Sequence, residues 1–282
     1  MAWLTVTGEI AKSVPPQLRW LTEFGVPDWS KVDLAIAIGA FTLFMSTIIV
    51  FLPMTLLAVR FIHLRSWISV LTGRARFRWR LFGTSLAISV GIAGIMIAAS
   101  IMAFPERFDT RTPISTYLAF LPFYLLLIPP QVAAEEVFFR GYLMQAVGHV
   151  TPLAWVRLLV PAVLFFALHL PNREVIEGGL PALLYFALIS AYLGWLALRG
   201  NGLEIAIGLH AGINFAGIAV VTTSHASIRA PGIFHLLVPN YWEDLIGIAI
   251  FCALHWLIIR RVLRRERSAS DSRPIANLPG RA

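Results

Sequence analysis

The sequence AEEVFFRGY at residues 134–142 places three charged side chains directly after an apolar run that extends from Ile114 to Ala134. A carboxylate or guanidinium near the bilayer centre costs roughly 2.5 to 3.5 kcal/mol even on a mild insertion scale. The three charges therefore need partners or a function that compensates for this cost. We expect the rest of the chain to supply both.

The composition of the chain is that of a protein that folds in lipid. Hydrophobic residues make up 58% of the chain and charged residues 13%, and the mean hydropathy is +0.75. This balance excludes an ordinary soluble domain. The single cysteine, Cys252, excludes a disulfide framework within the chain and a metal site built from several cysteines.

The net charge of +8 does not indicate a nucleic-acid partner, because the arginines gather between and after the apolar runs. Six of them and no acid lie from Arg60 to Arg80, and residues 260–282 hold seven arginines against Glu266 and Asp271. Membrane proteins mark their cytoplasmic side in this way. The sequence thus predicts a multi-pass protein with a cytoplasmic C-terminus, which for a bacterial protein means the cytoplasmic (inner) membrane.

The apolar runs predict an all-α, polytopic transmembrane bundle of about seven or eight spanning helices. Seven are expected, at residues 32–59, 81–104, 114–148, 152–170, 180–198, 204–221 and 242–259. The third run contains Pro129 and Pro130 and is expected to form one long helix kinked at these prolines, with two short helices as the alternative. Seven crossings place the basic loop and the basic tail on the same side and the N-terminus outside, whereas two short helices break this parity.

The same pattern divides the chain into segments. We expect a non-spanning N-terminal segment without a signal peptide (1–31), two spanning helices joined by the basic loop (32–113), a core that carries the charged motif (114–222), an outer loop with the last spanning helix (223–260), and a basic, disordered tail (261–282).

The two glutamates of the motif are expected to face different surroundings. Glu136 and Arg140 are four residues apart on one helix face, acid before base, so they are predicted to form a structural ion pair. Glu135 lies about 100° around the helix from Glu136 and can point into the interior of the bundle. The alternative is that both acids only neutralise Arg140 and anchor helices together.

Two further polar elements lie in apolar runs. His169 ends the sequence FFALH, and His210 and Asn214 share a helix face because they are four residues apart. On the opposite face of that helix, Gly208 and Gly212 allow a neighbouring helix to approach closely. Taken separately, His169 is interpreted as an interfacial residue. His210 and Asn214 are interpreted as residues that join two helices by hydrogen bonds.

If these elements converge, they form the parts of a hydrolase. Glu135 would act as general base on a water and later as acid to the leaving amine. His169, His210 and Asn214 could hold the water or stabilise the oxyanion. Alternatively Glu135, His169 and His210 could ligate zinc with a position left open for water. The sequence does not choose between zinc and a metal-free mechanism.

The ordered set Glu135-Glu136-x-x-x-Arg140, Phe165-x-x-x-His169 and His210-x-x-x-Asn214 resembles the type II CAAX prenyl endopeptidases and bacteriocin-processing enzymes, the Abi or CPBP family. The resemblance covers residues 114–222. It implies an all-helical intramembrane protease in which Glu135 is the catalytic glutamate and His169, His210 and Asn214 position water or metal. It also implies that Glu136 and Arg140 form the structural pair.

The predicted function is therefore an intramembrane endopeptidase that hydrolyses a peptide bond of a membrane-associated protein or peptide with a glutamate-activated water. Its partners would be that substrate and the lipid bilayer. A transporter, in which the charged motif and the two histidines relay protons or ions, is the rival class, although the chain shows no paired half-repeats. A non-catalytic membrane scaffold that keeps these residues for packing is a third reading.

Overall fold

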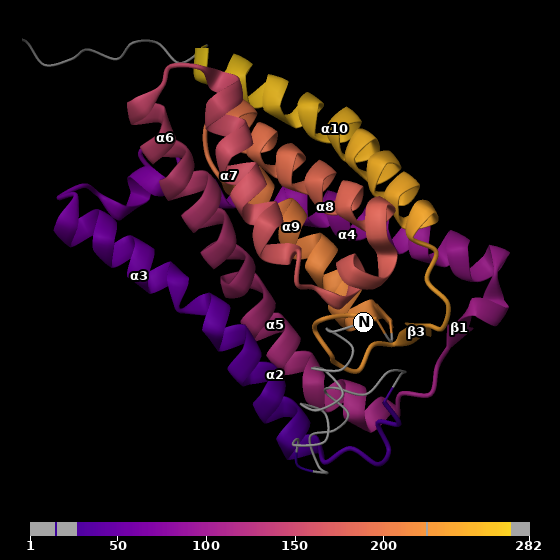
Figure 1. Cartoon of the computed structure of the whole chain (residues 1–282). Helices are drawn as coiled ribbons and strands as arrows, with labels where there is room; N and C mark the ends of the chain where they lie inside the picture. The colour runs from indigo at the N-terminus through magenta and orange to yellow at the C-terminus, as the bar shows by residue number, and fades with distance from the viewer. Residues whose placement is uncertain (1–14, 16–26, 224, 272–282) are drawn as a thin grey trace, which may run out of the picture.

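The computed structural model describes residues 15, 27–223 and 225–271, and side chains as far as Glu266. Helices form a bundle, and three very short strands lie together at one end of it (Figure 1). The predicted all-α transmembrane class is confirmed. The expectations for residues 1–26 and 272–282 lie, apart from residue 15, outside the described residues.

The helices follow one another as rods that cross the bundle. They are α2 (Leu34–Ile49) with α3 (Phe51–Leu57) and η2 (Ala58–Ile62), α4 (Trp79–Ala103), α5 (Ile114–Glu136) with η5 (Val137–Leu143) and α6 (Met144–Val150), α7 (Ala154–His169), α8 (Arg173–Gly200), α9 (Glu204–Phe215) with η6 (Ala216–Val220), and α10 (Tyr241–Asp271). Short 3-10 turns are η3 (Trp67–Val70) and η4 (Pro105–Arg107). In the small sheet, β3 (Phe234–Leu236) pairs antiparallel with β1 (Phe108–Asp109) and parallel with β2 (Val221–Thr223).

Five of the predicted spans are long and apolar enough to cross a bilayer. Within the described residues these are Leu34–Ile62, Trp79–Ala103, Ile114–Val150, Arg173–Gly200 and Tyr241–Glu266. The apolar helices Ala154–His169 and Glu204–Val220 are shorter than the twenty or so residues that a complete crossing needs. The membrane depth of these two helices is therefore set by packing against the five longer ones.

The run after Ile114 forms one continuous helical rod, as the sequence predicts, and three prolines lie inside its α-helical part. A π-helical segment, Val137–Leu143, begins directly after the two glutamates. Such wider turns occur often at functional sites. Gly141 lies in this segment against the backbone carbonyl of Val70, where a Cβ atom has no room.

α9 is the central helix, because it packs in both apolar cores. One core joins α9 to α2 and α5, and the other joins it to α4, α8 and α10. Every residue of α9 from Glu204 to Gly212 is buried. A Cβ at Gly208 would lie 2.6 Å from the carbonyl oxygen of Phe82, so the close approach of α4 that the sequence predicts at this glycine is present.

Polar contacts of two side chains, Arg78 and Ser85, hold α9 in place. Arg78 Nη2 donates to Glu204 Oε2 at 2.7 Å and to the Gly200 carbonyl at 2.7 Å. Ser85 Oγ donates to the Ile205 carbonyl at 2.8 Å and accepts from His255 Nε2 at 3.1 Å. Because α9 carries His210 and Asn214, these contacts also set the position of the polar site.

Two helices differ from the sequence-based expectation. α10 extends to Asp271. The sequence predicted that the span ends at residue 259 and that the chain is disordered from residue 261. The helix continues because Ile259 and Leu263 both pack in the second core and extend its buried face. α8 begins at Arg173, earlier than residue 180, and is interrupted at Gly179, whose φ is 56°. The turns before Gly179 place Glu174 beside the polar site.

Candidate active site

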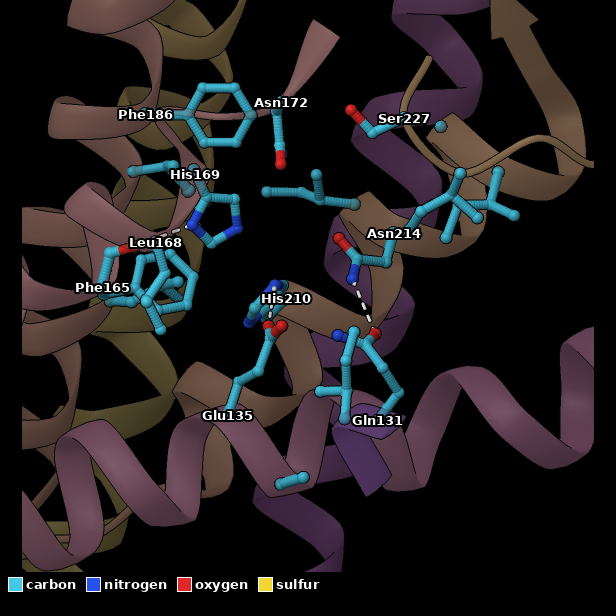
Figure 2. A pocket seen from close by; sticks show the side chains of 18 of the residues that line it. Gln131, Glu135, Phe165, Leu168, His169, Asn172, Phe186, His210, Asn214 and Ser227 are labelled. Carbon is cyan, nitrogen blue, oxygen red and sulfur yellow. Dashed lines mark hydrogen bonds and ion pairs between the residues drawn. The ribbon is translucent and has the colours of Figure 1, made fainter. Parts of the chain in front are cut away.

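The two adjacent glutamates of α5 enter different surroundings, as their 100° separation predicts. Glu136 is fully buried, and its Oε1 accepts a hydrogen bond from Arg140 Nη1 at 2.9 Å. Glu135 turns toward a cavity inside the bundle (Figure 2). One acid is thus part of the packing, and the other is available for chemistry.

Arg140 connects three helical elements. Its Nη2 donates to the carbonyl and to the Oγ of Ser190 on α8, at 3.1 and 3.3 Å. Its guanidinium carbon lies 4.1 Å from the ring centroid of Phe165 on α7, a cation–π contact. The ion pair with Glu136 therefore fixes the π-helical segment against both neighbouring helices.

His210 lies between the two glutamates. Its Nδ1 is 2.8 Å from Glu136 Oε1, and its Nε2 is 3.5 Å from Glu135 Oε2. Since a carboxylate oxygen only accepts, Nδ1 carries the proton that it donates to Glu136. Glu136 therefore orients the imidazole of His210 so that Nε2 faces Glu135.

His169 is the last residue of α7, and its ring is held from three sides. Nδ1 donates to the carbonyl of Phe165 at 2.8 Å, and the ring packs against those of Phe165 and Phe186, with centroids 4.5 and 4.9 Å away. With Nδ1 protonated, Nε2 of the neutral ring is an acceptor. Figure 2 shows this second nitrogen directed into the cavity.

Asn214 is positioned by a residue that the sequence analysis did not select. Its Nδ2 donates to Oε1 of Gln131 at 3.1 Å. Gln131 is buried and lies one helical turn before Glu135 on α5, so it joins α9 to the helix of the catalytic candidate. Its signal in the sequence was a lone amide in an apolar run, four residues before a glutamate.

The four predicted catalytic residues line one cavity of about 550 Å³. Further polar residues line it that the sequence analysis did not select: Gln131, Asn172, Glu174, Tyr185 and Ser227. Phe44 from α2 and Leu168 from α7 line its walls and are 42% and 68% exposed, so the cavity reaches the lipid-facing surface. The convergence that the sequence left open is thus present in the structure.

Ser227 and Glu174 come together from distant segments. Glu174 Oε2 accepts from the backbone nitrogen and from the Oγ of Ser227, at 3.0 and 2.6 Å. The two residues are not linked by any local spacing in the sequence. We call Asn172, Glu174 and Ser227 the polar rim of the cavity.

The residues do not form a ready-made zinc site. In the part of the chain that the structure describes, no group of three histidine, cysteine, aspartate or glutamate side chains is placed to hold a metal ion. Glu135 and His210 approach each other, but His169 is held between Phe165 and Phe186. The mechanism proposed below therefore contains no step through a metal.

The fold and the cavity define a polytopic α-helical membrane protein with a carboxylate and two histidines converging inside the bundle. Residues 114–216, which contain all four predicted catalytic residues, match the model of the family described as type II CAAX prenyl endopeptidase Rce1-like. The resemblance that the motifs predicted is thus confirmed over these residues, and the family they match is one of CAAX-type intramembrane proteases.

The comparison with other proteins gives one further similarity. The chain is 29% identical over 208 residues to the uncharacterized protein YyaK of Bacillus subtilis (strain 168), a match that covers 71% of this chain and 68% of that protein. No solved structure matches the chain.

Proposed function

We propose that this protein is an intramembrane endopeptidase in which Glu135 activates a water to hydrolyse a peptide bond of a membrane-associated protein or peptide. The observation that carries the proposal is the placement of His210 between two carboxylates. Glu136 holds its Nδ1 at 2.8 Å, and Glu135 lies 3.5 Å from its Nε2, at the wall of a cavity that His169 and Asn214 also line.

The proposed mechanism needs a proton on each nitrogen of His210, one donated from Nδ1 to Glu136 and one on Nε2 facing Glu135. An imidazolium donates to Glu136 and faces Glu135, and the charges of Glu135, Glu136, Arg140 and His210 then sum to zero. A neutral cluster lowers the cost of holding four ionisable groups inside the bundle. Glu135 is then an ionised base. Its ion pair with His210 holds the carboxylate in place, and the carboxylate can still accept a proton.

In the proposed reaction, a water donates one hydrogen bond to Glu135 and the other to Nε2 of His169. Glu135 takes a proton from the water as the oxygen forms a bond to the carbonyl carbon. Once Glu135 has lost its negative charge, the Nε2–H group of His210 can donate its hydrogen bond to the oxyanion instead. This hydrogen bond is stronger in the transition state than in the ground state. Glu135 then gives its proton to the leaving nitrogen as the C–N bond breaks.

The test is cleavage of a membrane-tethered peptide library by the purified protein in detergent, with Glu135→Gln as the main variant. Glu106→Gln is the matched control, because it is the same substitution at an exposed position outside the cavity. We expect cleavage by the wild type and the control, and a loss of at least about 100-fold in Glu135→Gln at equal folded yield.

Equal cleavage by Glu135→Gln and the wild type would remove Glu135 from the mechanism. A parallel arm with a chelator, followed by restoration with zinc, tests the metal alternative separately. Loss of activity with the chelator and recovery with zinc would show that the site rearranges around a metal during turnover, contrary to the mechanism proposed here.

A further inference from the structure

The lining of the cavity carries two acids and no arginine or lysine. Glu135 and Glu174 are the two carboxylates, and within the part of the chain that the structure describes no arginine or lysine side chain lines the cavity. Basic residues are not scarce in the chain, which has 23 arginines and lysines against 15 acids. In the proposed resting state Glu135 is paired with His210. Glu174 is therefore the acid of the lining whose charge is left to be balanced.

Uncharged donors hold the Glu174 carboxylate in place. Its Oε2 accepts from the backbone nitrogen and from the Oγ of Ser227, at 3.0 and 2.6 Å. Its Oε1 has only a long contact, 3.4 Å, with Nδ2 of Asn172. None of the ion pairs that the described residues form within 4 Å includes Glu174. Since a carboxylate has about four acceptor sites, Oε1 can accept from a further donor.

Glu177, one turn later on α8, has the opposite arrangement. Its Oε1 lies 3.8 Å from Nε of Arg173, and its Oε2 contacts Nδ1 of His225. Glu177 is not part of the cavity lining. Two acids in neighbouring turns of one helix thus differ in their partners. Glu177 has basic partners within the protein, whereas Glu174 lines the cavity, where a cation of a bound ligand can reach it.

Glu174 lies across the cavity from the reacting group. Its partner Ser227 and its neighbour Asn172 are on the opposite side of the cavity from Glu135, with His169 between them (Figure 2). An extended peptide rises about 3.4 Å per residue and turns alternate side chains to the same face. A peptide whose scissile bond lies at Glu135 can therefore reach Glu174 with a side chain a few residues away.

We propose that Glu174 is a specificity-determining residue that binds a positively charged side chain of the substrate, a lysine or an arginine, a few residues from the cleaved bond. A cation at Glu174 forms a charge-assisted hydrogen bond inside the bundle, where such a bond is stronger than in water. An acid at the same place in the peptide is repelled. That the ligand is a substrate rests on the proposed protease function, whereas the preference of the cavity for a cation does not.

The test compares the affinities of two peptides for the purified protein in a non-ionic detergent, measured by fluorescence anisotropy. Both are short leucine and alanine peptides with blocked ends and an uncharged fluorophore, and they differ only in one central residue, lysine or glutamine. All proteins carry Glu135→Gln, which prevents turnover and removes the other carboxylate of the cavity. Glu174→Gln is the test variant, and Glu177→Gln is the matched control one turn later. Ser227→Ala removes a hydrogen bond from Glu174 but leaves its charge.

We expect the lysine peptide to bind at least about 10-fold more tightly than the glutamine peptide, the effect of one hydrogen bond to a charged group. The preference should fall below about twofold in Glu174→Gln and remain in Glu177→Gln and Ser227→Ala. Equal affinities in the protein with Glu135→Gln alone, no binding of either peptide, or a preference that survives Glu174→Gln would overturn the proposal.

A second measurement needs no substitution at Glu174. Carbodiimide joins an amine directly to a carboxylate that it contacts, so it should attach the lysine peptide to Glu174, as identified by mass spectrometry. Attachment only to other carboxylates would contradict the proposed site, even if Glu174→Gln does not fold. Because neither measurement requires hydrolysis, a failure of Glu135 to cleave peptides would leave the preference for lysine unchanged.

Discussion

His210 Nδ1 and Glu136 Oε1 lie 2.8 Å apart, although the two residues are separated by 74 positions in the sequence. The same carboxylate oxygen accepts from Arg140 at 2.9 Å. Glu136 therefore has two functions in the structure: it neutralises a buried guanidinium, and it orients the histidine that faces Glu135. A residue predicted to be purely structural thus becomes part of the proposed catalytic arrangement.

We predict that Glu136→Gln destabilises the protein by roughly 3 to 5 kcal/mol, the usual cost of leaving one partner of a buried ion pair without its counter-charge. Gln can still accept hydrogen bonds from Arg140 and His210, so the loss would come mainly from charge. Unfolding in mixed detergent micelles measures it, with the exposed Glu106→Gln as a control that should change stability by less than about 0.5 kcal/mol. Equal stabilities would contradict the importance of the ion pair.

Gly208→Ala is expected to destabilise the contact between α9 and α4 by about 1 to 3 kcal/mol, because the added methyl group meets backbone and not a flexible side chain. Its Cβ would lie 2.6 Å from the Phe82 carbonyl oxygen and 2.9 Å from Ser85 Cβ. The matched control is Gly91→Ala on α4, where a Cβ meets nothing within 4 Å. The control should be neutral or slightly stabilising, since alanine favours helix. Similar losses in both variants would show that the close helix approach is not the cause.

Gln131→Leu should lower kcat by about 10- to 100-fold, the range in which residues that orient a reacting group act. The substitution leaves Asn214 Nδ2 without its acceptor, so the amide is no longer held at the cavity wall. Gln145→Leu makes the same change outside the cavity and should retain kcat per folded molecule. A KM change without a kcat change in Gln131→Leu would instead assign Gln131 to substrate binding.

His235, in the sheet outside the spanning helices, predicts a pH dependence of stability. Burial lowers its pKa from 6.5 to about 4. The negative charge of nearby Asp109 opposes this decrease, and the positive charge of Arg111 adds to it. Between these two values the unfolded chain binds a proton that the folded protein does not, so stability decreases as the pH falls from 6.5 toward 4. Unfolding of the wild type should therefore become easier across this window.

The control for this effect is His235→Gln, which has no titrating group but can still hydrogen-bond Thr112, the partner of His235 Nε2 at 2.6 Å. Stability measured at pH 7, 6, 5 and 4 should fall less steeply in the variant. Parallel curves for the two proteins would assign the acid sensitivity to other groups.

The sequence by itself determined the helical rods, the continuous helix after Ile114 and the pairing of Glu136 with Arg140. Each of these depends on local quantities: the length of an apolar run, or a spacing of four residues along one helix. The resemblance of the three motifs likewise required only their order in the chain. The resemblance to the family followed from these features without any tertiary contact.

Only the tertiary structure decided which side chains meet. The partnership of Glu136 with His210, the support of Asn214 by Gln131 and the rim of Glu174 with Ser227 each join different elements. Such contacts depend on the tilt and rotation of packed helices, on the π-helical turn at Val137–Leu143 and on the break at Gly179, which periodicity does not encode. The sequence therefore supplied the reactive groups, and the packing around α9 decided how they face one another and where the cavity extends.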